Sequence, residues 1–119
     1  MNDLTVEQVI AIHKSIMISD GDDTRVLSEA YLHQLVFRAN LIPGLFRRAA
    51  FVLYSIAAYP PFRDGNKRTA RILAGQILME EGYSIAPEDD GFFTLIHGVA
   101  AYEVEPEDIE YWLCKHAKK

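Results

Sequence analysis

The chain has 119 residues, half of them hydrophobic and about a quarter charged, so it can bury one core and we expect a single domain over residues 1–119. The formal net charge of -5 argues against direct nucleic-acid binding, because a nucleic-acid surface needs a dominating cationic field. Cys114 is the single cysteine, no apolar run approaches the roughly 20 residues of a membrane span, and the start, MNDLTVEQVI, lacks the features of a signal peptide, so we expect a cytoplasmic protein without membrane contact.

Helical periodicity begins close to the first residue. Between residues 5 and 19, apolar side chains recur at three- and four-residue spacing, and Thr5 with Gln8 forms a capping-box pair. The acidic run 20–23 (DGDD) is typical of a solvated loop, and Ser28 is a candidate N-cap for a second helix that ends near residue 38. The sequence therefore opens with two predicted helices.

The middle of the chain predicts two longer helices. Alanines favour a helix over residues 45–59, and the proline pair Pro60–Pro61 ends it, because the residue before a proline is pushed out of the α region. The run 67–81 is strongly periodic, and Gly82 can cap its C-terminal end. We expect this run to be the central helix.

Two further helices are expected in the last third of the chain. They cover residues 88–101 and 106–116, and Pro106 suits the first helical position of the second one. No alternating run is longer than three or four residues, so no strand is predicted. The predicted fold class is all-α.

Charged residues gather between the third and fourth predicted helices. Residues 63–66 (RDGN) form the turn, and Lys67, Arg68 and Arg71 follow on the first turn and a half of the next helix, with both arginines on one face. The N-terminus of a helix already carries a positive partial charge, so each cation is unfavourable there by about 0.3–1 kcal/mol unless an anion binds. The pattern predicts an anion-binding site.

The turn itself suits the same anion. Gly65 can take a positive φ angle without strain, which lets backbone N–H groups around Asn66 converge into a nest, and the Asn66 amide can donate as well. Phosphate is the natural guest at such a helix N-terminus. Asp64 would repel phosphate on its own, so it is a candidate ligand for Mg²⁺ that bridges phosphate oxygens, with helix capping as the alternative role.

The run 62-FRDGNKRTAR-71 resembles the signature of the Fic/Doc family, H-x-F-x-[D/E]-[G/A]-N-[G/K]-R-x-x-R. Other stretches look like the corresponding parts of Doc-type (death on curing) proteins, namely 4-LTVEQVIAIHKSI-16, 49-AAFVLYSIAA-58, 81-EGYSIAPED-89 and 107-EDIEYWL-113. The resemblance covers essentially the whole chain. It implies a compact helical domain with the motif loop at the N-terminus of the central helix.

The resemblance also implies a transferase that uses ATP or another nucleotide, with Mg²⁺, to modify a hydroxyl of a target protein. Fic members typically transfer AMP. Doc is the toxin of a toxin–antitoxin pair, transfers phosphate to a translation elongation factor, and is neutralised by a small partner called Phd. The implied partners are therefore a nucleotide, such a target protein and a Phd-like antitoxin.

Residue roles follow from the same resemblance. Phe62 is buried to anchor the loop, Asp64 is the metal ligand, Arg68 contacts the nucleotide phosphates, and Lys67 is typical of the Doc branch. The implied catalytic residues are Asp64, Asn66, Lys67 and Arg68. The implied nucleotide site, including the anion hole, consists of Gly65, Asn66, Lys67, Arg68 and Arg71.

Two positions depart from the family pattern. The general base of the family is a histidine two residues before the phenylalanine, and Pro60 stands there without a titratable group. Arg71 matches the Fic signature, whereas Doc typically lacks this arginine. Three functions stay open: a slowed Doc-like phosphotransferase, a degenerate member that binds nucleotide or an antitoxin-like partner without turnover, and an AMP-transferring Fic enzyme.

The remaining histidines and aromatic residues receive structural interpretations. His13 lies on the apolar side of the first helix and is interpreted as a core or hydrogen-bonded histidine. His97 is in addition a candidate for a surrogate base. No histidine has a ligand partner at zinc-site spacing. The aromatic residues near the C-terminus, interpreted as core and helix-contact residues, are Phe92, Phe93, Tyr102, Tyr111 and Trp112.

Overall fold

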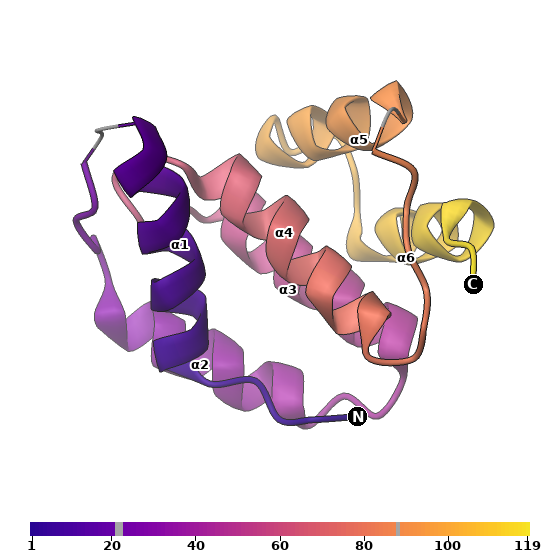
Figure 1. The fold of residues 1–119 in the computed structure, drawn as a ribbon, viewed down its shortest axis with the longest axis horizontal. Coiled ribbons are helices and arrows are strands. Elements are labelled where there is room, and N and C mark those ends of the chain that lie inside the picture. The colour runs from indigo at the N-terminus through magenta and orange to yellow at the C-terminus, as the bar shows by residue number, and fades with distance from the viewer. Residues whose placement is uncertain (21–22, 88) are drawn as a thin grey trace.

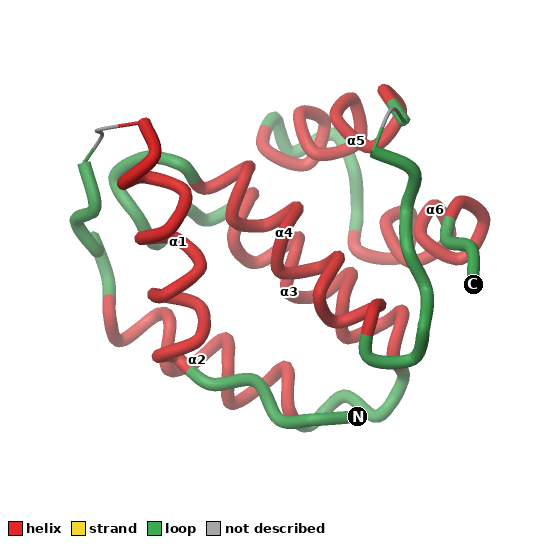
Figure 2. Tube along the Cα trace, viewed as in Figure 1, coloured by secondary structure: helices red, strands yellow, loops and turns green. Residues whose placement is uncertain are grey.

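Within residues 1–20, 23–87 and 89–119, which the computed structural model describes, the chain forms six α-helices (Figure 1). These are α1 (Val6–Asp20), α2 (Glu29–Asn40), α3 (Leu45–Ala58), α4 (Asn66–Met79), α5 (Asp90–Ala100) and α6 (Pro106–His116). Figure 2 shows that loops connect them and that no strand occurs in these ranges. The predicted all-α fold class is confirmed.

The predicted helix boundaries agree with the structure to within about two residues. Capping explains several of them. The Ser28 hydroxyl accepts the N–H of Tyr31 at 3.1 Å, and the Thr5 hydroxyl accepts the N–H of Gln8 at 3.0 Å. Pro106 occupies the start of α6, as predicted. Residues 21 and 22 of the predicted acidic loop, and the predicted helix start at 88, lie outside the described residues.

The end of α4 follows the predicted glycine cap. Gly82 has a left-handed backbone (φ 84), its N–H donates to the Met79 carbonyl at 3.0 Å, and the N–H of Tyr83 donates to the Leu78 carbonyl at 3.1 Å. This is a Schellman arrangement, which satisfies the last carbonyls of the helix. The chain therefore leaves α4 in a defined direction.

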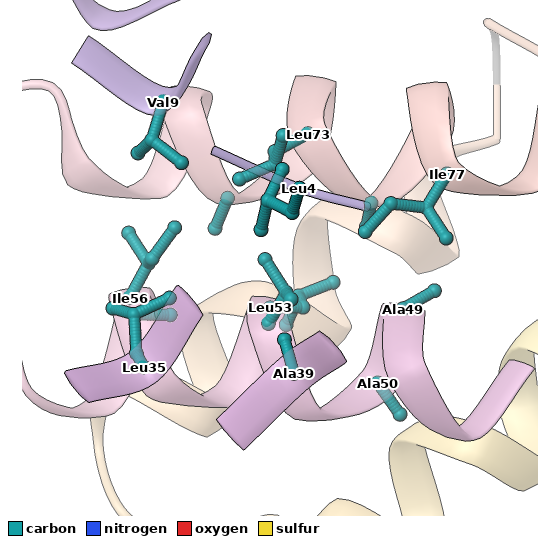
Figure 3. Packing of buried hydrophobic residues seen from close by; sticks show 14 of the residues in the cluster. Leu4, Val9, Leu35, Ala39, Ala49, Ala50, Leu53, Ile56, Leu73 and Ile77 are labelled. Carbon is teal, nitrogen blue, oxygen red and sulfur yellow. The ribbon is translucent and has the colours of Figure 1, made fainter. Parts of the chain in front are cut away.

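The core lies around the α3–α4 pair, which forms the most extensive helix contact of the fold. Helix α1 packs on α4, α2 packs on α3, and α5 and α6 lie on the other side of this pair (Figure 1). Figure 3 shows the apolar side chains that meet between them, including Val9, Leu35, Leu53, Ile56, Leu73 and Ile77. Buried alanines of α3 let the two central helices approach closely. Because α1 and α5 both pack on α4, the N-terminus of α4 lies between them (Figure 1).

None of the helices in the described ranges combines the length and the apolar character that a bilayer-spanning segment requires.

Candidate functional site

The loop from residue 59 to 65 connects α3 to α4 and carries the predicted site. Helix α3 ends at Ala58, and the following Tyr59, which precedes Pro60, has left the helical region (φ -130, ψ 78). The carbonyl of the buried Pro61 accepts two N–H groups from the segment before α2, from Leu27 at 2.7 Å and Ser28 at 3.3 Å. The proline pair therefore both stops α3 and fastens the loop to the start of α2.

A second main-chain contact fastens the loop to the same segment. The N–H of Arg63 donates to the Arg25 carbonyl at 3.1 Å, next to an isolated antiparallel bridge between Val26 and Phe62. The Asp23 carboxylate contacts the guanidinium of Arg63 at 3.4 Å. The hydrogen bond from the Arg25 side chain lowers the pKa of Asp23 from 3.8 to about 2. This carboxylate thus stays ionised beside the loop over the neutral range.

Hydrogen bonds between Asn66 and the backbone of Phe62 join the two ends of the motif turn. The Phe62 side chain is fully buried, as the family resemblance implied. The Asn66 Oδ1 accepts the N–H of Phe62 at 3.0 Å, and the Asn66 Nδ2 donates to the Phe62 carbonyl at 2.9 Å. The predicted amide donor is therefore engaged within the loop, and only its second amide hydrogen and the backbone N–H remain for a ligand.

Gly65 adopts the predicted positive φ angle. Its backbone is left-handed (φ 75, ψ 15), and it serves as the N-cap residue of α4. A Cβ atom at this position would clash with the Met17 Sδ of α1, so a larger residue would require the Met17 side chain to shift in addition to the strain of the positive φ. Helical bonding starts with the Thr69 N–H and the Gly65 carbonyl at 3.0 Å. The N–H groups of Asn66 and Lys67 therefore have no intrahelical acceptor and face the helix N-terminus.

A cavity of about 520 Å³ opens at this helix N-terminus. From the motif it is lined by Arg63, Asp64, Gly65, Asn66, Lys67 and Arg68, and from elsewhere by Ala57, Ala58, Pro60, Phe93, His97, Ala100 and Tyr102. The structure thus brings five of the six predicted site residues to one cavity. Three cationic side chains and one carboxylate among its lining residues give it a positive charge, which suits an anion.

Arg71, the sixth predicted site residue, is directed elsewhere. Its Nη2 lies 3.5 Å from the Pro87 carbonyl, and its guanidinium lies 5.8 Å from the centroid of the Phe92 ring at the start of α5. Arg71 is not among the residues that line the cavity. Helical spacing predicted that Arg68 and Arg71 lie on one side of α4. Arg71 is nearly one turn further from the loop than Arg68, and at that position it contacts the start of α5 instead.

Asp64 faces the cavity from an exposed position. Its Oδ1 accepts the N–H of Gly65 at 3.1 Å, a group that precedes α4, so the carboxylate does not act as a side-chain cap of that helix. No cluster of three or more His, Cys, Asp or Glu side chains suited to a metal occurs among the described residues. One carboxylate, completed by phosphate oxygens and water, fits the way proteins hold Mg²⁺.

Apart from His97, which the sequence offered as a candidate surrogate base, the part of the cavity wall that comes from α5 and the turn after it was not predicted. Phe93 and Tyr102, which the sequence placed in helix contacts, are 64% and 65% exposed, and Tyr111 is 71% exposed. The expectation of a core position was wrong for these three, although the Tyr102 ring lies 6.1 Å from that of Tyr59 at the end of α3, whereas the buried Phe92 does stack on Trp112. Tyr102 also has a left-handed backbone (φ 62), which is uncommon for a tyrosine. Sequence periodicity carries no signal for this approach of α5 to α4.

His13 has the structural role that the sequence suggested. It is fully buried on α1, its Nε2 lies 2.7 Å from the Asp64 carbonyl oxygen, and its ring stacks on Phe62. Such a contact between residues 51 positions apart depends on how α1 packs against the loop. The sequence predicted a hydrogen-bonded core histidine without showing its partner.

A sequence model of the Fic/DOC family matches residues 3–78. This match covers α1 to α3, the motif loop and all but the last residue of α4, which is more than half of the chain. The chain therefore belongs to the Fic/DOC family and carries a Fic-type domain. No curated protein matches the chain. The wall residues Phe93, His97 and Tyr102 lie beyond the matched range.

Proposed function

We propose that this chain is a Doc-like toxin that acts in the cytoplasm as a single Fic-type domain and transfers the γ-phosphate of ATP to a hydroxyl of a target protein, such as a translation elongation factor. One observation carries the proposal. A left-handed Gly65, the N-terminus of α4 and the side chains of Lys67 and Arg68 face one cavity, and Asp64 faces it too. Convergent N–H groups and cations at a helix N-terminus are suited to phosphate groups.

The proposed roles divide the site between binding and charge stabilisation. The N–H groups at the start of α4 would hold the phosphates, and Lys67 and Arg68 would neutralise the charge that spreads over the transferred group. Asp64 would hold Mg²⁺, which supplies further charge neutralisation when bound. The closed ring between Asn66 and Phe62 would keep these donors in place before the nucleotide arrives.

The position of Arg71 favours phosphate transfer over AMP transfer. Lys67 already follows the Doc pattern, and Arg71 is the one Fic-like departure from it. Because the Arg71 guanidinium lies against Phe92 and the Pro87 carbonyl, it does not add a third helix-borne cation to the cavity. The set of cations at the site is then that of a Doc-type member.

The proposed reaction also needs an acceptor for the hydroxyl proton. Pro60 lines the cavity where the family resemblance expects a histidine, and it has no group that accepts a proton. We assign this role to His97 of α5, which lines the same cavity. The hydroxyl proton moves to an imidazole nitrogen of His97, the oxygen bonds the γ-phosphorus, and the bond from that phosphorus to the β–γ bridging oxygen breaks to release ADP.

Pro60 also supports a second candidate function. A member that binds nucleotide, or a Phd-like antitoxin, without turnover would need the nest and the cations but no base. The experiment that separates the candidates uses purified protein, Mg²⁺, cell lysate and ATP labelled in either the γ- or the α-phosphate. Label from γ-ATP on a protein band supports phosphate transfer, label from α-ATP supports AMP transfer, and bound nucleotide without either supports the second candidate.

A further inference from the structure

His13 is a buried polar side chain that the proposed reaction does not use, yet it lies directly against the motif loop. Its imidazole is fully buried, and its ring centroid lies 3.7 Å from that of Phe62 with an angle of 6° between the two planes. Its Nε2 lies 2.7 Å from the carbonyl oxygen of Asp64. A carbonyl oxygen only accepts hydrogen bonds, so the Nε2 carries the hydrogen in this contact.

The other ring nitrogen indicates that His13 does more than occupy space in the core. The Nδ1 of His13 is buried and has no hydrogen-bond partner among the described residues. An unpartnered buried nitrogen destabilises the fold, and an apolar side chain of similar shape would avoid that cost. The gain that offsets it is therefore the bond from Nε2 to the Asp64 carbonyl.

This bond determines the orientation of one peptide group in the loop. In a trans peptide the carbonyl and the following N–H point in opposite directions. With the Asp64 carbonyl directed at α1, the N–H of Gly65 is directed away from α1, and it donates to the Asp64 Oδ1 at 3.1 Å. A rotation of this peptide, which glycine would permit, would break the bond to the Asp64 Oδ1 and turn a carbonyl oxygen toward the anion.

We infer that His13 is a positioning residue, which holds the Asp64–Gly65 peptide with its carbonyl directed at α1 and not at a phosphate-bearing ligand, so that the N–H groups of Asn66 and Lys67 at the start of α4 meet no opposing carbonyl. The inference deepens the proposed function and rests on it for the identity of the ligand. Met17, one turn further along α1, fills the space that the missing Cβ of Gly65 leaves, so α1 supports this peptide at two points.

The test compares His13→Gln with His13→Met. Both side chains are similar in length, and only glutamine can donate to the Asp64 carbonyl. We expect His13→Met to weaken binding of inorganic phosphate and of ATP with Mg²⁺ by up to about tenfold, the loss that one hydrogen bond brings, and His13→Gln to retain most of the parent affinity. Calorimetry gives the affinities. Urea unfolding confirms that both variants fold.

Amide hydrogen exchange at Gly65 and Asn66, measured by NMR, reports on the loop without any ligand. We expect faster exchange at these two amides in His13→Met than in His13→Gln, with the α3 and α6 amides unchanged. Equal exchange and equal affinity in the two variants would overturn the inference. If the parent binds neither phosphate nor ATP, the proposed function fails, and the exchange comparison alone decides whether His13 positions the loop.

Discussion

The Asn66 carboxamide forms two hydrogen bonds with the backbone of Phe62, one to its N–H and one to its carbonyl. This pair joins the first residue of α4 to the buried anchor of the loop. A side chain that both donates and accepts is needed to make both bonds, and an isosteric carboxylate could only accept. Substitutions of Asn66 therefore test how the loop supports the proposed anion site.

Asn66→Asp is expected to weaken binding of ATP with Mg²⁺ by roughly a hundredfold, because it loses the bond to the Phe62 carbonyl and places a negative charge at the nest. Asn66→Ala loses both bonds without adding charge, so its loss should be smaller. Isothermal calorimetry on both variants measures the difference. An Asn66→Asp variant with parent affinity would show that no anion binds at this end of α4.

Arg68 and Arg71 provide a matched pair. Arg68 lines the cavity and Arg71 contacts Pro87 and Phe92 instead. We expect Arg68→Ala to reduce nucleotide affinity by roughly ten- to a hundredfold through loss of a charge-assisted hydrogen bond, and Arg71→Ala to leave it nearly unchanged. Equal losses of nucleotide affinity in the two variants, measured by the same calorimetry, would show that Arg71 does contact the nucleotide and would weaken the case for phosphate transfer.

His97→Gln should lower phosphate transfer by roughly a hundredfold, the low end of general-base catalysis, while nucleotide affinity stays constant.

Pro60→His should raise transfer at least about tenfold by supplying a base at the position that the family resemblance assigns to it. In a Pro60→His background, His97→Gln should then lower the rate of phosphate transfer much less than it does in the parent. Initial rates with γ-labelled ATP measure each step, and Asp64→Ala serves as the control that abolishes metal-dependent turnover. Unchanged rates in His97→Gln would remove His97 from the reaction.

Gly65→Ala and Gly75→Ala test the backbone requirement. At Gly65 the positive φ and the approach of the Met17 Sδ both oppose a Cβ atom, so the free energy of unfolding should fall by about 1–3 kcal/mol. At Gly75, within α4, nothing lies within 4 Å of the added Cβ, so the same change should raise it by about 0.5–1 kcal/mol. Urea denaturation measures both. A Gly65→Ala variant as stable as the parent would contradict the left-handed conformation.

The Asp23 carboxylate should titrate near pH 2 rather than at its ordinary 3.8, because Arg25 stabilises its charged form. A lowered pKa means that this pairing favours the folded state above about pH 4 and that the contribution disappears as the pH falls through about 2. Carbon-13 NMR of the carboxyl group follows the titration. Arg25→Gln should move the midpoint toward the ordinary value, and an unmoved midpoint would assign the shift to another group.

Much of this architecture could be predicted from the sequence because it rests on local rules. Apolar periodicity determined the helices, and proline, serine and glycine marked ends at Pro60, Ser28 and Gly82. The left-handed Gly65 followed from the same chemistry, because glycine is the residue that tolerates this backbone.

What the sequence could not show depends on tertiary packing. The contact of His13 with the Asp64 carbonyl, the approach of His97 to the motif and the turn of Arg71 toward α5 each join segments far apart in sequence or on different helices. Periodicity gives the face of a helix but not the neighbour that covers it. The three positions therefore needed the assembled fold.

Pro60 differs from its neighbours in one respect that bears on the history of the site. The bonds that hold the loop are made by Pro61, Phe62, Arg63, Asp64 and Asn66, while Pro60 is exposed at the cavity wall. One nucleotide change converts either histidine codon into a proline codon, and two of the four proline codons return to histidine in one change. Because none of these bonds involves Pro60, an exchange at this position in either direction should leave the backbone of the motif loop unchanged.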